Sequence, residues 1–187
     1  MHSQGARKAR LLLLAMVGVI ATLAAPSAPA EDLTLSTPAF DSQEHIPTTY
    51  TCDGQGIAPA LHWQHIPSGT RSLALIVTDP DAPDPAAPKT TWVHWIVYDL
   101  PATSRGLQQG TQADALPTSA RNGENSWQHS GYGAPCPPIG QHRYIFTLYA
   151  LDTRLPNLDT PDRAKLTQAM AGHILAKTQI VGLYRRP

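Results

Sequence analysis

Cysteine is scarce in this chain of 187 residues, which has only Cys52 and Cys136. Two isolated cysteines do not provide the close-spaced ligand pairs of a structural zinc site. Basic and acidic residues are balanced at fourteen each, with no block of like charge. This balance argues against a nucleic-acid-binding protein, which usually presents a basic face. Internal repeats and low-complexity tracts are also lacking, and the length suits one domain with a core of its own.

Long hydrophobic runs are lacking except in one place, Leu11 to Leu23. Basic residues precede this run at positions 7, 8 and 10, and Ala28-Pro29-Ala30 follows it. This order is typical of a secretory signal peptide, and the run is short for a membrane span. We therefore expect residues 1–30 to be a signal peptide and residues 31–187 to be the mature domain. A retained anchor helix is the alternative.

Cleavage near Ala30 would leave eleven basic against fourteen acidic residues, a formal charge of −3. The mature protein would be periplasmic or secreted, with no stable membrane anchor. Because exported proteins meet an oxidising compartment, we expect a Cys52–Cys136 disulfide. In the chain-entropy model a bond that closes so long a loop contributes about 4 kcal/mol.

Three apolar segments predict buried strands: Ser72 to Thr78, Trp92 to Leu100 and Tyr144 to Leu151. Each is rich in β-branched or aromatic residues and ends at turn-forming residues. Weaker candidates are the ranges 33–36, 60–63 and 180–184. No long helical segments separate the strands, so an antiparallel β-sandwich with one or two peripheral helices is favoured over a parallel sheet. The polar stretch from 102 to 130 is interpreted as an ordered or functional loop, because unstructured loops of that length are uncommon.

One segment has helical periodicity. Thr160 suits an N-cap, Pro161 the first helical position and Asp162 the positive end of the helix dipole. Apolar residues and one histidine then recur at helical spacing: Leu166, Ala169, Met170, His173 and Ile174. We therefore expect a helix reaching Ile174, with His173 packed in its buried face.

The sequence Asp79-Pro80-Asp81-Ala82-Pro83 directly follows the first strand candidate. By itself it is typical of a solvated turn. In the second strand candidate, alternation places Trp92, His94 and Ile96 on one face and residues 93, 95 and 97 on the other. A carboxylate opposite His94 would orient its ring and leave one nitrogen for a ligand.

The segment from Gly131 to Gly140 reads GYGAPCPPIG. Three glycines and three prolines in ten residues impose an unusual backbone path, and such loops can direct amides at an anion. Since prolines donate no hydrogen bond, the Cys136 amide is the natural donor. His142 follows and could reach the same place. Arg143 could bind an anion or brace the loop.

The ordered set DPDAP, WVHWIVYDLP and GYGAPCPPIGQHRYIFTLYALD is similar to the phosphatidylethanolamine-binding protein family, also called Raf-kinase-inhibitor-like proteins. The segments TCDGQGIAPALHW and AMAGHILAKTQIVGLYRR resemble its bacterial subgroup. The resemblance covers about residues 33 to 186. It implies a sandwich of two antiparallel sheets and a small cavity for phosphate, acetate or a phospholipid head group.

The resemblance also implies site residues. By position it assigns anion binding to Asp79, Asp81, Trp92, His94, Cys136, Pro137 and His142. Eukaryotic relatives extend beyond the last strand with a helix that supplies a tyrosine to the pocket. This chain stops at Pro187, so whether Tyr184 reaches the pocket is an open question at this stage.

These observations favour a small-anion-binding protein over an enzyme, with no cofactor and no metal. No serine lies in a GxSxG elbow. Two alternatives stay open: a protein-interaction module that inhibits a protease or kinase, and a metal-dependent hydrolase that uses the same aspartates and histidines. Exposed sheet edges also allow a homodimer.

Overall fold

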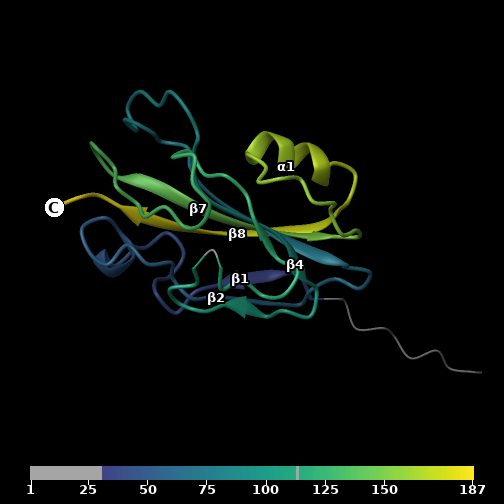
Figure 1. Cartoon of the computed structure of the whole chain (residues 1–187). Helices are drawn as coiled ribbons and strands as arrows, with labels where there is room; N and C mark the ends of the chain where they lie inside the picture. The colour runs from purple at the N-terminus through teal and green to yellow at the C-terminus, as the bar shows by residue number, and fades with distance from the viewer. Residues whose placement is uncertain (1–30, 113) are drawn as a thin grey trace, which may run out of the picture.

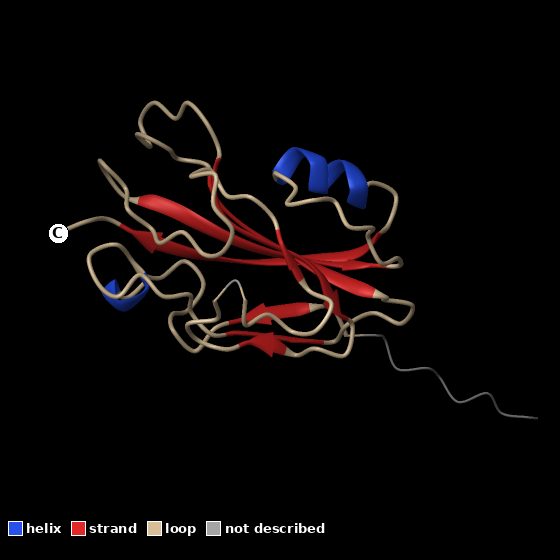
Figure 2. Cartoon of the chain, viewed as in Figure 1, coloured by secondary structure: helices blue, strands red, loops and turns tan. Residues whose placement is uncertain are grey.

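Two antiparallel sheets lie face to face, and one helix covers the outer face of the larger sheet (Figures 1 and 2). The structure is a computed structural model that describes residues 31–112 and 114–187. The predicted signal peptide lies outside the described residues. Within them, no helix has the length and apolar character needed to cross a membrane.

The strands form the sandwich that the sequence predicts. The small sheet has the order β1-β2-β5, and the large sheet has the order β6-β4-β3-β7-β8. Strands β3, β4 and β7 match the three apolar segments, whereas β8 is longer than its candidate range. The bounds are Thr34–Ser36 (β1), Leu61–Gln64 (β2), Ser72–Asp79 (β3), Trp92–Pro101 (β4), Gly106–Leu107 (β5), Arg121–Asn122 (β6), His142–Leu151 (β7) and Ile174–Tyr184 (β8), with a short 3-10 helix at Thr48–Tyr50 (η1).

Strand β3 is buried on both faces, which explains its unbroken apolar sequence. On one face Leu73, Leu75 and Val77 join the core between the two sheets. On the other face Ala74 and Ile76 pack in a second cluster beneath the helix. The strand thus holds the sandwich and the helix together, and it places Asp79 at the end of a rigid element.

The helix α1 (Arg163–Met170) is shorter than expected at both ends. Asp162 is the N-cap and accepts a hydrogen bond from the Lys165 amide at 2.8 Å. The predicted cap, Thr160, has a positive φ of 48° instead. Gly172 with φ 81° follows the helix and turns the chain into β8.

The expected buried position of His173 is therefore wrong. The side chain is 47% exposed and pairs with Asp152 at 2.8 Å. Ile174 begins the edge strand β8 and is also exposed. Apolar residues of two different elements had by coincidence the spacing of one helix, although Leu166 and Met170 are buried as predicted.

Strand β4 contains an irregularity at His94. Val77 pairs with Trp95 and Thr78 pairs with Val93, so His94 is an extra residue opposite β3. A bulge of this kind redirects a side chain. The predicted alternation is consequently wrong beyond this point. Val93 packs in the cluster beneath α1, whereas Trp95 belongs to the core between the sheets.

The stretch 102–130 is ordered at the residues that the structure describes, 102–112 and 114–130. It contributes β5 to the small sheet and β6 to the large sheet. Leu107 is buried in the core between the sheets, and Asn125 is also buried. The stretch is therefore part of the sandwich.

Candidate functional site

A cavity of about 260 Å³ lies where β3 ends and β7 begins. It brings together six of the seven predicted site residues: Asp79, Trp92, His94, Cys136, Pro137 and His142. Ligand cavities for drug-sized molecules usually start near 300 Å³, so this volume suits a small chemical group. Residues far apart in the sequence meet here because β3, β4 and β7 are neighbours in one sheet.

Asp79 and His142 form a buried pair at the base of the site. The His142 Nδ1 lies 2.6 Å from Asp79 Oδ2, and the side chains are 0% and 5% exposed. The other ring nitrogen, Nε2, lies 3.0 Å from the Ile139 carbonyl oxygen. The second oxygen of Asp79 accepts from the Asp81 amide at 2.8 Å. Both nitrogens of His142 are thus occupied within the protein.

His94 is held by two hydrogen bonds to one glycine. Its Nδ1 donates to the Gly133 carbonyl oxygen at 2.7 Å, and its own carbonyl accepts from the Gly133 amide at 2.7 Å. Burial lowers the pKa of His94 to about 4, although the Gly133 contact and Asp79 oppose this shift. The ring is therefore neutral at neutral pH.

Asp81 is the predicted site residue that does not line the cavity. Its carboxylate accepts from Arg143 Nε at 2.9 Å, from a terminal guanidinium nitrogen at 2.6 Å and from the Arg143 amide at 2.9 Å. These bonds lower the pKa of Asp81 and raise that of Arg143. Of the two roles considered for Arg143, the structure shows the bracing one.

The cavity also contains residues that sequence reasoning did not place there: Ala82, Pro83, Trp127, Pro138 and Tyr144. Tyr144 was identifiable, because it lies two residues after His142 in a strand and so shares its face. Its hydroxyl is buried without a hydrogen-bond partner. Burial, followed by the charge of Asp79, raises the Tyr144 pKa above its ordinary value, so the hydroxyl keeps its proton.

Trp127 had no sequence signal for the site. Its ring stands edge-on to His94, with centroids 5.1 Å apart. It also covers Gly133 so closely that a Cβ there would come within 2.2 Å of Trp127 Cζ3. The glycine is therefore required for the tryptophan to close this side of the cavity.

The predicted disulfide is present: Cys52 and Cys136 are bonded, with Cα atoms 5.4 Å apart. It ties the cavity wall to the segment that carries Asp53. Tyr184 does not line the cavity; its hydroxyl donates to Asp53 at 2.8 Å. Arg186 also binds this carboxylate, at 2.9 Å. These bonds fasten the last strand beside the disulfide.

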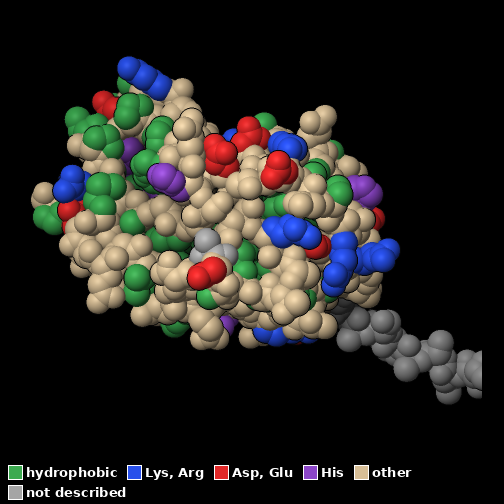
Figure 3. All heavy atoms as spheres, viewed as in Figure 1, with side chains coloured by type: hydrophobic (Ala, Val, Ile, Leu, Met, Phe, Trp, Pro, Cys, Tyr) green, Lys and Arg blue, Asp and Glu red, His purple; other side chains and the backbone are tan. Residues whose placement is uncertain are grey.

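Hydrophobic side chains gather at the left end of the molecule in Figure 3, the end at which β8 terminates and the C-terminus lies in Figure 1. Two of the exposed large hydrophobic residues flank the cavity: Trp127 is 39% exposed and Ile139 is 56% exposed. Pro83 and Pro138 are exposed lining residues as well. The cavity mouth is thus apolar, whereas polar groups lie deeper.

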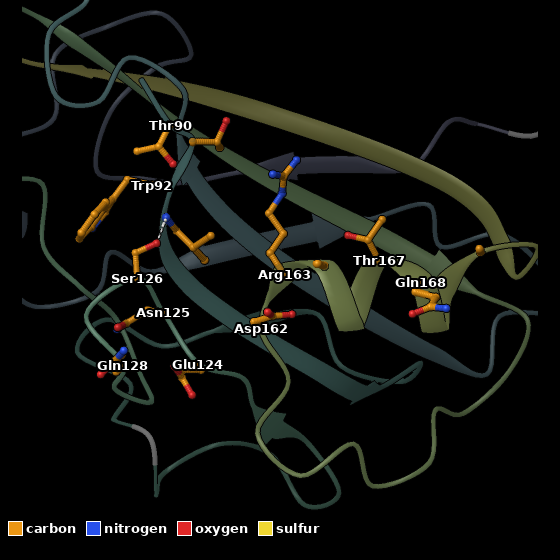
Figure 4. A pocket seen from close by; sticks show the side chains of 14 residues that line it. Thr90, Trp92, Glu124, Asn125, Ser126, Gln128, Asp162, Arg163, Thr167 and Gln168 are labelled. Atoms are coloured by element: carbon orange, nitrogen blue, oxygen red, sulfur yellow. Dashed lines mark hydrogen bonds between the residues drawn. The ribbon is translucent and has the colours of Figure 1, made fainter. Parts of the chain in front are cut away.

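A second hollow of about 860 Å³ lies between α1 and residues 124–128 and shares only Trp92 with the cavity. Figure 4 shows its polar lining, with Arg163 and Thr167 from the helix and Glu124 and Gln128 from the facing loop. It is open, and both polar and apolar side chains line it. Nothing in its lining matches the predicted anion site except Trp92.

The chain belongs to the phosphatidylethanolamine-binding protein family. The sequence model of that family matches residues 36–185. A UPF0098 protein of Methanothermobacter thermautotrophicus is 43% identical over 155 residues, covering 82% of this chain and 99% of the relative. A UPF0098 protein of Chlamydia muridarum is 42% identical over 152 residues, covering 81% and 98%.

Solved structures agree with this assignment. A Chlamydia trachomatis protein described as a phosphatidylethanolamine-binding protein homologue superimposes with a TM-score of 0.77 at 38% identity, covering 83% of this chain and 99% of its own. Escherichia coli YbcL, described as a member of the mammalian PEBP family, gives a TM-score of 0.76 at 29% identity, covering 84% and 100%. The family and fold expected from the sequence motifs are confirmed.

Proposed function

We propose that this chain is an exported protein that binds a small anion, of the phosphate or phospholipid head-group type, in the cavity between Asp79, His94 and Cys136. One observation carries the proposal: polar groups of the lining residues have no partner in the described chain. The Tyr144 hydroxyl and the indole Nε1 of Trp92 are buried and unpaired among the described residues, and His94 Nε2 and the Cys136 amide also lack a partner there. Buried polar groups without partners are rare, and a bound ligand would satisfy them.

The cavity supports a small ligand group. Its volume of about 260 Å³ accommodates a phosphate or acetate but not a whole lipid. Aromatic rings and prolines form the walls, so a bound anion would be partly shielded from water and its few hydrogen bonds would gain strength. The apolar mouth would tolerate a hydrocarbon substituent on the anion. This combination favours an anionic group carried on a larger organic molecule.

Calorimetric titration of residues 31–187 with phosphate and acetate tests the proposal. We expect binding of one anion per chain, weakened several-fold by Tyr144→Phe, which removes one donor hydroxyl. His173→Ala is the matched control, because this histidine is exposed at the other end of the sheet. Absence of binding for every anion, or equal affinities for wild type and Tyr144→Phe, would contradict the proposal.

Export is tested separately. Expression of the full chain in a bacterial host, followed by fractionation, should place the protein in the periplasm or medium. Mass spectrometry should show a mature chain that begins at Glu31. Recovery of the intact chain in the membrane fraction would instead support a retained anchor.

A protein-interaction module is the second candidate, favoured by the open hollow beside α1. Deleting residues 102–130 would not test it, because this stretch supplies β5, β6 and the buried Leu107. Point substitutions are cleaner. If a partner docks here, Arg163→Glu with Thr167→Glu should abolish its capture from periplasmic extract, while Tyr144→Phe should leave capture unchanged. Capture that survives the double substitution would reject this surface.

A further inference from the structure

The ring nitrogen Nε2 of His94, which has no partner among the described residues, is a hydrogen-bond acceptor. A carbonyl oxygen can only accept, so the 2.7 Å contact with Gly133 requires the proton of His94 to sit on Nδ1. In the neutral ring Nε2 is then a lone pair. The second hydrogen bond between the two residues, from the Gly133 amide to the His94 carbonyl, prevents the loop from moving away. The tautomer is thus set by the backbone.

His94 is neutral because burial outweighs the neighbouring groups that favour its charged form. Burial is the largest effect and lowers its pKa to about 4. The titratable groups that face it are Asp79 from β3 and His142 and Tyr144 from β7. Asp79 favours the charged ring, whereas His142 opposes it. Above the His94 pKa, the cavity therefore presents an acceptor at Nε2.

The Asp79–His142 pair supplies no donor to a ligand. His142 Nε2 donates to the Ile139 carbonyl, and one proton is shared across the 2.6 Å contact between Nδ1 and Asp79. Whichever side holds this proton, the pair has no net charge. Its carboxylate oxygens add acceptor capacity to the base of the cavity. Neither His94 nor His142 therefore offers a ligand a hydrogen-bond donor from its ring.

Positive charge is lacking as well. None of the eleven described lining residues is lysine or arginine. The adjacent Arg143 is already held by Asp81. A fully ionised anion would therefore bury its charge beside a pair that has no net charge, with no lysine or arginine in the lining to compensate, which is costly. An oxyanion that keeps one O–H can donate to His94 Nε2 and accept from the Cys136 amide or the Tyr144 hydroxyl.

We propose that this cavity selects oxyanions that carry their own proton, and that His94 Nε2 accepts a hydrogen bond from the O–H group of the oxyanion. The chemical class is a singly protonated phosphate or phosphomonoester, and anions without a proton, such as sulfate esters, are rejected. The inference rests on the proposed anion-binding function and adds to it a rule about protonation.

Methyl phosphate and methyl sulfate are a matched pair of probes for calorimetry. At about pH 5 both carry one negative charge, but only the phosphate ester keeps an O–H, because its second pKa is near 6. We expect methyl phosphate to bind tighter by a factor of about 10–100 at that pH, since methyl sulfate leaves a buried acceptor unpaired. The affinity for methyl phosphate should then fall up to about tenfold per pH unit above its second pKa.

Methyl sulfate should gain affinity only as the pH approaches about 4, where His94 acquires a proton. Equal affinities for the two esters at about pH 5, or a methyl phosphate affinity that does not change up to about pH 8, would overturn the inference and leave anion binding intact. Absence of binding by both esters at every pH would overturn the proposed function with it.

Two substitutions locate the effect at His94. Asparagine can keep the bond to Gly133 but is too short to reach the ligand. His94→Asn should therefore weaken the binding of methyl phosphate and reduce its advantage over methyl sulfate. Glutamine can present an N–H₂ group where Nε2 stood. His94→Gln should therefore strengthen the binding of methyl sulfate and bring its affinity within about threefold of that for methyl phosphate. Thermal melts check that both variants fold. If His94→Gln kept the full preference for methyl phosphate over methyl sulfate, the assignment of this selectivity to His94 would be overturned.

Discussion

Two histidine–aspartate pairs lie at opposite ends of β7, and they have the same chemistry in different surroundings. His142, the first residue of the strand, is 2.6 Å from Asp79, and the side chains are 0% and 5% exposed. His173 is 2.8 Å from Asp152, just beyond the last residue, and the side chains are 47% and 46% exposed. The distances are nearly equal, so burial decides what each pair contributes.

Access to water explains why the two pairs contribute differently to stability. At the exposed pair, water solvates each partner when the other is removed, and such pairs contribute little. At the buried pair, removal of one partner strands the other without solvent. The buried pair also lies at the base of the ligand cavity. Because its protons are held in hydrogen bonds within the protein, it cannot donate one to a ligand.

The largest effect is expected from His142→Ala. It leaves Asp79 buried without its partner, so the free energy of unfolding in urea should fall by about 3–5 kcal/mol at neutral pH. Adding Asp79→Asn removes the stranded charge and should recover at least about 1 kcal/mol. A loss as small as that of His173→Ala would break the contrast between the two pairs.

Removing the disulfide should come next. Replacing both Cys52 and Cys136 by serine should lower the free energy of unfolding by about 2–4 kcal/mol, because the unfolded chain regains the freedom of a long loop. Thermal unfolding of oxidised wild type and the double variant measures the loss. Titration of unreduced wild type in denaturant should find no free thiol, and two thiols would contradict the bond.

Arg143→Ala should cost about 1–3 kcal/mol, because the buried Asp81 loses two charge-assisted hydrogen bonds. Arg143 lowers the Asp81 pKa in the folded state below 3.8. The ionised carboxylate therefore stabilises the fold above about pH 4, and this contribution is lost as the pH falls through the lower folded pKa. The difference between wild type and variant should accordingly shrink in acid. A difference that is constant with pH would show that lost packing, not the charge, is responsible.

The smallest effect is expected from His173→Ala. The exposed pair with Asp152 should contribute no more than about 0.5 kcal/mol, and urea unfolding should barely distinguish the variant from wild type. Anion binding should not change. A loss above about 2 kcal/mol would mean that solvation is not what separates the two pairs.

Much of the fold was predictable because its signals are local. Strand β3 is apolar at successive positions since both faces are covered, and β4 and β7 carry the same signal. The helix was predicted with wrong ends. Gly172 is a typical helix terminator, but the apolar spacing continued across it into β8 and obscured this signal.

The site was predictable as a set of residues but not as a set of hydrogen bonds. Motif order indicated Asp79, His94 and His142 together, and the cavity does bring them together. Asp81 had the same sequence signal as Asp79, yet it turns to Arg143 instead of the cavity. Trp127 belongs to the lining without any signal, because its place depends on the close approach of Gly133.

By itself the sequence determined the family, the strands and the chemical types gathered at one end of the sheet, since these follow from composition and order along the chain. Only the tertiary structure decided which polar atoms stay free. The bulge that directs His94, the carbonyl of Gly133 that holds its proton and the carbonyl of Ile139 that occupies His142 are all backbone features. Backbone carbonyls are alike in every residue, so their partners are settled by the packed fold and not by side-chain identity.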